Sequence, residues 1–334
     1  MIVARAPLRI SLGGGGTDLP SYYREHGGFV VSTAIDQYVR VLVTSGFRDR
    51  YLVKHLECEE VDEPREIGHP ILREAICHHW EGPPLEIASV GDVPPGTGLG
   101  SSGAYAVSVV KALRLAAGAD DSPDELAEAA CELEIELLGR SVGKQDQYAA
   151  AHGGLCAYTF KPDDTVDVRR LRLDDETLRS LREEFLLFYT GEARSASSIL
   201  SHQVDRTLAG DEQTAARLHR TKELALEACA ALEEDDLGRF AELMDAQWEA
   251  KRARAPGAVT EAIERLRGLA KRSGGLGVML MGAGGGGFLL VYTRSPDETR
   301  RAMARAGLAE LRFGLDVTGC EGAGPPLLTP SGDA

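Results

Sequence analysis

A glycine-rich segment in the first third of the chain has the residue types that bind phosphate groups. It covers 93–103 and reads Val-Pro-Pro-Gly-Thr-Gly-Leu-Gly-Ser-Ser-Gly. Its glycines allow the backbone to approach an anion, and the helix predicted to begin at Ser101 adds unpaired N–H donors and a positive dipole end. The hydroxyls of Ser101 and Ser102 could contact a phosphate or a magnesium ion. The segment is not a Walker A loop, because no Gly-Lys-Ser/Thr follows it.

The same segment also fits two other interpretations. Residues 98–103 satisfy the G-x-G-x-x-G pattern of dinucleotide-binding folds, with Asp120 or Asp121 near the spacing expected of a ribose-binding acid. Against this, the prolines at 94–95 lengthen a turn that is tight in those folds, and the helix predicted at 101–117 is followed by another helix. A simple turn that starts a helix is the third interpretation. A nucleotide-linked oxidoreductase therefore stays the alternative from another chemical class.

The elements that must position this loop mix strands and helices without a regular strand-helix-strand repeat. Hydrophobic patterning predicts strands at 1–12, 29–33, 38–45, 85–91, 155–160, 166–173, 184–189, 277–281, 288–292 and 310–315. It predicts helices at 71–80, 101–117, 123–138, 175–182, 194–209, 211–232, 234–251, 257–273 and 296–306, followed by a frayed tail. The glycine run at 282–287 lies between two of these strands and predicts a hairpin. This order of elements predicts an α+β fold in two parts.

Length and composition narrow the class of protein. At 334 residues the chain exceeds the size at which one hydrophobic core stops growing, so we expect two domains. The formal net charge of -15 argues against a general nucleic-acid binder, because polyanion binding needs a concentrated basic surface. No apolar run is long enough to cross a membrane and no secretory signal precedes the first strand, so we expect a cytoplasmic protein without membrane partners. The six cysteines lack C-x-x-C spacing and predict reduced thiols rather than disulfides or a zinc site.

Three segments together resemble the motifs of GHMP kinases, the family that includes galactokinase, homoserine kinase, mevalonate kinase and phosphomevalonate kinase. The first is Arg-Ala-Pro-Leu-Arg-Ile-Ser-Leu at 5–12, followed by the glycine run that ends at Asp18. The second is the loop at 93–103, and the third is 279–288. Two positions depart from the usual pattern, since Gly103 stands where the family commonly has Ala and Met281 where Ser is common.

The resemblance implies a two-domain GHMP kinase fold, with ATP and substrate bound between the domains. It predicts an N-terminal domain at 1–165 with a ribosomal-protein-like sheet and a ferredoxin-like C-terminal domain at 166–334. It implies an ATP-dependent and Mg²⁺-dependent sugar kinase with a small-molecule substrate, and the oligomeric state is left open between monomer and homodimer.

Within the family, the chain is most similar to D-glycero-D-manno-heptose 7-phosphate 1-kinases and their sugar 1-kinase relatives. The similarity is carried by Gly14 to Pro20, by the run at 143–148, by Tyr189-Thr190-Gly191, and by Trp248 with Lys251. It implies phosphorylation of the anomeric hydroxyl of heptose 7-phosphate to give the 1,7-bisphosphate. Kinases that act on fucose, or on an octose phosphate in antibiotic biosynthesis, share much of the pattern and remain alternatives.

The resemblance also implies roles for individual residues. Asp146 matches the catalytic aspartate that faces the acceptor hydroxyl, and Arg9 matches a cation that neutralises Asp146 or the transferring phosphoryl group. Glu134 and Ser102 match the protein ligands of Mg²⁺. The implied ATP-binding residues are Pro95, Gly96, Thr97, Gly98, Leu99, Gly100, Ser101, Ser102 and Gly103. The implied substrate-binding residues are Gly15, Gly16, Thr17, Asp18, Gly191, Arg194, Ser195, Lys251, Gly284 and Gly285.

Overall fold

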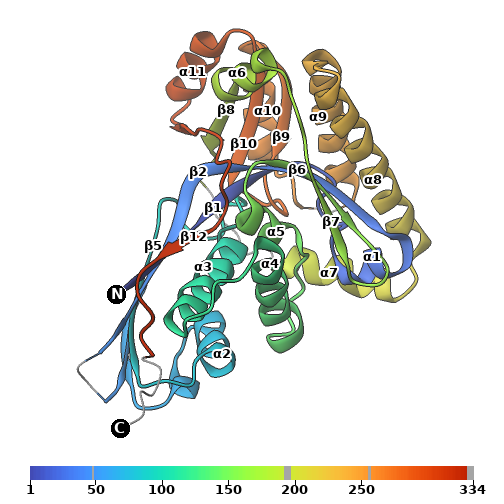
Figure 1. Cartoon of the computed structure of the whole chain (residues 1–334). Helices are drawn as coiled ribbons and strands as arrows, with labels where there is room; N and C mark the ends of the chain where they lie inside the picture. The colour runs from blue at the N-terminus through green and yellow to red at the C-terminus, as the bar shows by residue number, and fades with distance from the viewer. Residues whose placement is uncertain (47–48, 192–196, 255–256, 329–334) are drawn as a thin grey trace.

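The computed structural model describes residues 1–46, 49–191, 197–254 and 257–328, and it contains two β-sheets with helices packed on their faces (Figure 1). The larger sheet has the strand order β12-β1-β2-β5-β3-β4, and β6 with β7 continues it from β2. Its strands are β1 (Ile2–Gly13), β2 (Gly28–Ser45), β3 (Tyr51–Lys54), β4 (Cys58–Val61), β5 (Leu85–Gly91), β6 (Leu155–Phe160), β7 (Val166–Arg170) and β12 (Glu321–Ala323).

Helices from the first half of the chain cover one face of this sheet. They are α1 (Pro20–His26), α2 (Pro70–His79), α3 (Ser101–Ala116), α4 (Pro123–Cys131) and α5 (Gln145–His152), with a 3₁₀ turn η1 (Pro64–Glu66) and a π-helical turn η2 (Glu132–Leu137). α3 packs against β1 and β2 through an apolar face that includes the fully buried Val107, Val110 and Leu113. This burial fixes the start of α3, and with it the glycine-rich loop, relative to β1.

The smaller sheet is antiparallel, with the order β11-β8-β10-β9. Its strands are β8 (Phe185–Tyr189), β9 (Gly275–Leu280), β10 (Phe288–Thr293) and β11 (Ala309–Leu311). Both faces are buried, so successive residues of β8 enter different cores: Phe188 packs with Trp248, whereas Phe185 stacks on Tyr292 and contacts Phe240.

The second half of the chain supplies the remaining helices. They are α6 (Asp175–Glu183), α7 (Ser197–Leu208), α8 (Glu212–Glu233), α9 (Leu237–Arg254), α10 (Glu261–Arg272) and α11 (Pro296–Arg305). α8 packs on β1 and β2 of the larger sheet, and α9 packs on both α8 and β9 (Figure 1). The pair α8 and α9 therefore connects the two sheets, and the end of α9 lies where the sheets meet.

The α+β fold is confirmed, and most predicted elements lie within a few residues of their predicted bounds. The strands predicted at 29–33 and 38–45 are one long strand, β2, because its residues keep pairing with β1 across the intervening bulge. The tail was predicted to be frayed, but its residues 321–323 form β12 against β1. The short strands β3 and β4 and the helices α1 and α5 were not predicted. The domain division at 165–166 stays a prediction; in the sheets, β7 still pairs with β6.

The structure also bears on the predictions about the cysteines and about membrane-spanning segments. All six cysteines are free thiols, as their spacing predicts. Among the described residues, no helix combines the length and the apolar character needed to cross a membrane.

Candidate active site

A cavity of about 1170 Å³ lies where the two sheets meet, and all three glycine-rich motifs line it. β1 and its glycine run form one wall, the loop before α3 forms another, and α9 with the turn between β9 and β10 forms a third. The cavity is large enough for a nucleotide and a second small molecule, since single drug-sized sites occupy roughly 300–1,000 Å³.

The predicted phosphate loop contacts the third motif directly. Gly98 has φ of 87°, and a Cβ atom built on it would lie 2.8 Å from the carbonyl oxygen of Met281. A Cβ atom on Gly282 would lie 2.5 Å from Cα of Gly98. Only glycine tolerates both this backbone conformation and this approach. Thr97 and Leu99, two of the predicted ATP-binding residues, are buried, and the Thr97 hydroxyl donates to Pro94 O at 3.0 Å, so both side chains support the loop from inside.

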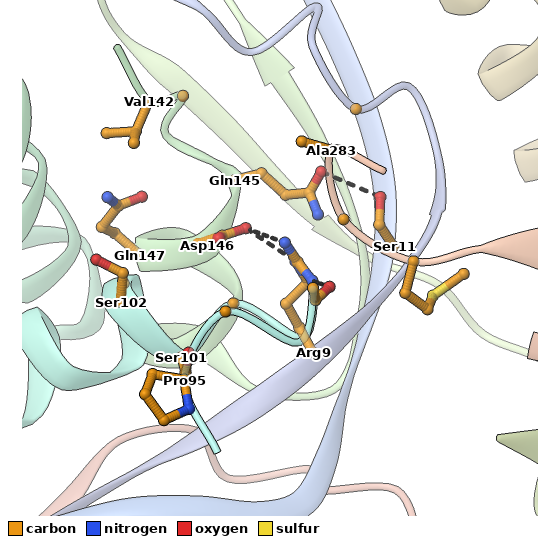
Figure 2. Close-up of a pocket in the computed structure, with 18 of the residues that line it drawn as sticks. Arg9, Ser11, Pro95, Ser101, Ser102, Val142, Gln145, Asp146, Gln147 and Ala283 are labelled. Carbon is orange, nitrogen blue, oxygen red and sulfur yellow. Dashed lines mark hydrogen bonds and ion pairs between the residues drawn. The ribbon is translucent and has the colours of Figure 1, made fainter. Parts of the chain in front are cut away.

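Arg9 connects the first motif to the loop and to Asp146. Its Nη2 lies 2.6 Å from Oδ1 of Asp146, its Nε donates to the same oxygen at 2.8 Å, and its Nη1 donates to Gly98 O at 2.7 Å. Figure 2 shows the two side chains pointing toward each other across the cavity wall. The Arg9 side chain is 8% exposed and that of Asp146 is 31% exposed, so the carboxylate is the member of the pair that a ligand can reach.

Asp146 lies in the first turn of α5, a helix that hydrophobic patterning did not predict. A carboxylate is favoured there by the positive end of the helix dipole. A Cβ atom on Gly103 would lie 2.6 Å from Cβ of Asp146, so the absence of a side chain at 103 allows α3 and α5 to approach closely. The departure from the family pattern at Gly103 is therefore part of how this chain positions Asp146.

Ser102 and Glu134 are brought together at the start of α3. Ser102 Oγ donates to Glu134 Oε1 at 2.5 Å, and the guanidinium of Arg140 donates to both oxygens. Gln147 Nε2 donates to the other carboxylate oxygen at 2.8 Å. Burial raises the pKa of Glu134, although its hydrogen bonds and Arg140 oppose that shift. The π-helical turn η2 turns this glutamate inward from a helix whose neighbours Glu132 and Glu136 are exposed or half-exposed.

The oxygens of Ser102 and Glu134 fit a magnesium ion. Mg²⁺ prefers hard oxygen ligands, and it usually takes one or two protein groups and completes its shell with water and substrate phosphates. The cationic Arg140 already lies against both oxygens, which shows that the position favours positive charge. Among the described residues, no group of three or more acidic, histidine or cysteine side chains is placed to hold a metal ion.

Asp18 is held at the base of the glycine run of the first motif. Its carboxylate accepts from Gly16 N at 2.8 Å and from Gln145 N at 3.1 Å, so it links the glycine run to the residue before Asp146. Burial, and then the charge of Asp146, raise the pKa of Asp18. The neighbouring Thr17 is fully buried, and its hydroxyl bonds to Gly14 O and Phe29 O. Asp18, Gly15 and Gly16 line the cavity, whereas Thr17 supports the turn.

The other predicted substrate-binding residues are dispersed. Lys251 lines the cavity, and its ammonium group donates to the carbonyl oxygens of Leu280 and Gly282. Gly284 lines the cavity, and Gly285 N donates to Ala258 O at 2.7 Å. Gly191 is exposed and is not part of the cavity wall. The predictions for Arg194 and Ser195 fall outside the described residues.

Comparison with known proteins now decides the family. The model of the GHMP kinase N-terminal domain matches residues 70–154, and the model of the GHMP kinase C-terminal domain matches residues 228–309. This chain belongs to the GHMP kinase family. It is therefore an ATP-dependent kinase, and the cavity between its sheets is the candidate active site of that kinase.

Individual relatives resemble the chain along most of its length. The D-glycero-alpha-D-manno-heptose 7-phosphate kinase of Campylobacter jejuni is 29% identical, over 90% of this chain and 91% of the relative. The bifunctional fucokinase/GDP-fucose pyrophosphorylase of Arabidopsis thaliana is 25% identical over 90% of this chain but only 30% of its own length. The crystal structure of a D-glycero-D-manno-heptose 1-phosphate kinase from Bacteriodes thetaiotaomicron superposes with a TM-score of 0.78, covering 97% of this chain and 99% of the relative at 24% identity.

The structure removes the dinucleotide interpretation of the loop. After α3 the chain enters α4, and β6 joins the sheet antiparallel to β2, so no parallel strand-helix-strand unit surrounds the loop. The two acids proposed for a ribose are engaged at the end of α3, where Asp120 pairs with Lys111 and Asp121 with Arg114.

Sequence reasoning missed several polar side chains that line the cavity. Arg140, Gln145 and Gln147 surround the predicted acids, and Gln145 accepts from Ser11 at 3.1 Å (Figure 2). The run at 143–148 was recognised as a motif, and this was a signal that its glutamines have roles beside Asp146. Arg254 gave no such signal, because an arginine at the end of a charged helix resembles many surface residues.

Proposed function

We propose that this GHMP kinase transfers the γ-phosphoryl group of MgATP to the anomeric hydroxyl of a sugar phosphate, with D-glycero-D-manno-heptose 7-phosphate as the substrate. One observation carries the proposal: Arg9 joins the carboxylate of Asp146 to the backbone of the glycine-rich loop, within a single cavity. A group that binds the acceptor and a loop that binds the donor phosphates are thereby held next to each other, as phosphoryl transfer requires.

In this mechanism the acceptor hydroxyl is bound by Asp146. Its oxygen attacks the γ-phosphorus, the bond from that phosphorus to the β,γ-bridging oxygen breaks, and ADP leaves. The hydroxyl proton passes to the Asp146 carboxylate or to water, and a loose transition state makes orientation at least as important as base strength. Arg9 and the N–H groups at the start of α3 stabilise negative charge on the transferring group.

The remaining acids have separate roles. Mg²⁺, when bound at Ser102 and Glu134, would neutralise charge on the ATP phosphates. Asp18 would accept hydrogen bonds from sugar hydroxyls, since it lines the cavity beside Gln145 and Asp146. The choice of a heptose 7-phosphate is supported by the relative from Campylobacter jejuni, which resembles this chain from end to end.

A substrate panel tests the proposal. The purified chain is incubated with MgATP and heptose 7-phosphate, fucose or mannose, and phosphorus NMR determines the position of the new ester. We expect a new anomeric phosphate on the heptose 7-phosphate. Turnover of fucose alone would change the proposed substrate but keep the proposed reaction, as the similarity to the bifunctional plant enzyme allows. Failure to consume ATP with every sugar and sugar phosphate would reject the proposed function.

A further inference from the structure

Arg254 is a cation that faces the cavity, and within the described ranges no acidic side chain forms an ion pair with it. It is the last residue of α9, and among the described residues a single hydrogen bond holds its guanidinium, from Nη1 to Thr221 Oγ1 at 2.9 Å. Its Nε is buried and has no hydrogen-bond partner. Within the described part of the chain, no carboxylate lies within 4.0 Å of the guanidinium. Since arginine carries five N–H donors, most of its hydrogen-bonding capacity is unused.

The other arginines of the cavity differ in this respect. Arg9 pairs with Asp146 and Arg140 pairs with Glu134. Burial of a charge without a directly bonded counterion is costly, and it lowers the pKa of Arg254 to about 10, a shift that the charge of Asp18 opposes. The C-terminal end of a helix favours a cation, but this does not require burial: the exposed Arg252 lies in the same last turn of α9 and pairs with Glu249. Among the described residues, Arg254 therefore has the charge of Asp18 in its surroundings but no anion bonded to its guanidinium.

Arg254 lies on the acceptor side of the cavity, beside the first glycine run. A Cβ atom on Gly16 would lie 3.5 Å from Cζ of Arg254 and 3.1 Å from Nε2 of Gln203, so the glycine run packs directly against both side chains. The N–H of Gly16 donates to Asp18, and Asp18 accepts from the backbone of Gln145, the residue before Asp146. Successive contacts thus lead from Asp146 through Asp18 and Gly16 to Arg254.

The glycine-rich loop, which we assign to ATP, lies on the other side of Asp146 from Arg254. Arg9 connects Asp146 to the loop at Gly98, and Gly103 approaches Asp146 from α3. The contacts of Arg254 are with Thr221 and Gly16, and among the described residues no hydrogen bond or ion pair joins it to this loop. These contacts favour the acceptor end of the cavity over the donor phosphates.

We propose that Arg254 binds the phosphate that the sugar already carries before the reaction. This inference depends on the proposed function. In a sugar that reacts at C1 and is phosphorylated at its last carbon, the hydroxyl and the anion are at opposite ends of the molecule. Asp146 and Arg254, separated by Asp18 and the glycine run, match that arrangement. A guanidinium can donate two parallel hydrogen bonds to a phosphate, which would complete the unused donors.

Lys251, which the resemblance implies as a substrate-binding residue, is less suited to bind this phosphate. Its ammonium group donates to the carbonyl oxygens of Leu280 and Gly282, so it supports the third motif. Arg254 lies three residues later, at the end of the same helix. Most of its guanidinium donors there can still bind a ligand.

The test compares Arg254→Met with the matched control Arg252→Met from the same helical turn. Steady-state rates are measured for the full chain with MgATP and either heptose 7-phosphate or the same heptose without its phosphate. We expect Arg254→Met to lower kcat/KM for the phosphorylated sugar by about a hundredfold, mainly through KM, because two charge-assisted hydrogen bonds are lost. The rate with the unphosphorylated heptose and the KM for ATP should stay within about twofold, and Arg254→Lys should recover part of the loss. Arg252→Met should match the unmodified chain.

Several results would overturn the assignment. It is wrong if Arg254→Met slows both sugars equally, or if the unmodified chain uses both sugars equally well. Should Arg254→Met fail to fold, Thr221→Val removes the hydroxyl that holds the guanidinium, and it must raise KM selectively for the phosphorylated sugar. If no sugar is turned over, the proposed function fails separately. Calorimetry with heptose 7-phosphate then decides about Arg254, which is supported if binding is about a hundredfold weaker in Arg254→Met and rejected otherwise.

Discussion

Arg9 Nη2 and Asp146 Oδ1 are 2.6 Å apart, although 137 residues separate them in the chain. Arg9 belongs to β1 and Asp146 to the first turn of α5, and α3 packs on both of these elements. The ion pair therefore forms only when the larger sheet and its helices have assembled. It places a partly exposed carboxylate beside a loop whose backbone is suited to phosphate.

Removal of the Asp146 charge should separate catalysis from nucleotide binding. Asp146→Asn keeps the size of the side chain, but the amide can neither accept the hydroxyl proton nor balance Arg9. We expect kcat to fall by about a hundredfold to ten-thousandfold, with little change in ATP affinity. Rates from a coupled assay and ATP titration by calorimetry measure the two effects. Asp120→Asn is the control and should keep full activity, because the exposed Asp120 carboxylate pairs with the buried Lys111 and neither residue lines the cavity. Wild-type kcat in Asp146→Asn would refute the catalytic assignment.

Glu134 should determine the magnesium requirement. Glu134→Gln preserves the shape of the side chain and removes the charge that would bind the metal together with Ser102. We expect the Mg²⁺ concentration for half-maximal activity to rise by roughly tenfold or more, since loss of a group that only orients a metal ligand already costs about 10–100-fold. A magnesium titration at fixed ATP measures it. The exposed Glu132, two residues earlier, supplies the control Glu132→Gln. Equal magnesium curves for both variants would show that Glu134 is only structural.

The glycine at 103 should be required in this chain, even though alanine is common at that position in the family. In Gly103→Ala the new Cβ would lie 2.6 Å from Cβ of Asp146 and 2.9 Å from N of Gln147. We expect a loss of about 1–3 kcal/mol in the free energy of unfolding, as for other overpacked sites, together with a lower kcat. Urea denaturation and steady-state rates measure both. Gly268→Ala in α10 is the control, because its Cβ would meet only the flexible end of Arg272 and should stabilise the helix by up to about 1 kcal/mol. Unchanged kcat and stability in Gly103→Ala would show that the helices can separate at no cost.

Lys251 should make the free energy of unfolding depend on pH. Burial lowers the pKa of its ammonium group to about 7, whereas an unfolded lysine has a pKa of about 10.4. Between these two values the unfolded chain binds a proton that the folded chain does not, so this group makes the free energy of unfolding rise with pH. The contribution is absent from Lys251→Met.

Urea denaturation at pH 7 and pH 9 measures this effect. We expect the free energy of unfolding of the unmodified chain, relative to that of Lys251→Met, to be higher at pH 9 than at pH 7. Lys54→Met, at an exposed pair with Glu86, should show no such shift. A difference that is constant across this pH range would contradict the lowered pKa.

The local structure around the phosphate loop could be predicted from sequence because its causes are local. The apolar face of α3, the capping box of α4 at Ser122 and Glu125, and the glycine run before β10 each carry their signal within a few residues. The helix α5 was missed, because its short and alanine-rich sequence has almost no amphipathic pattern. β3 and β4 were missed because four-residue strands give little periodicity.

By itself, the sequence determined the α+β class, the position of the glycine-rich loop before a helix and, through three motifs, the family. Which side chains meet was decided only by the tertiary structure. Arg9 and Asp146 meet because α3 and α5 pack on β1. Arg254 is enclosed because α8 and α9 pack against the first glycine run. Contacts between distant segments depend on how whole elements bury their apolar faces, and no short stretch of sequence contains that information.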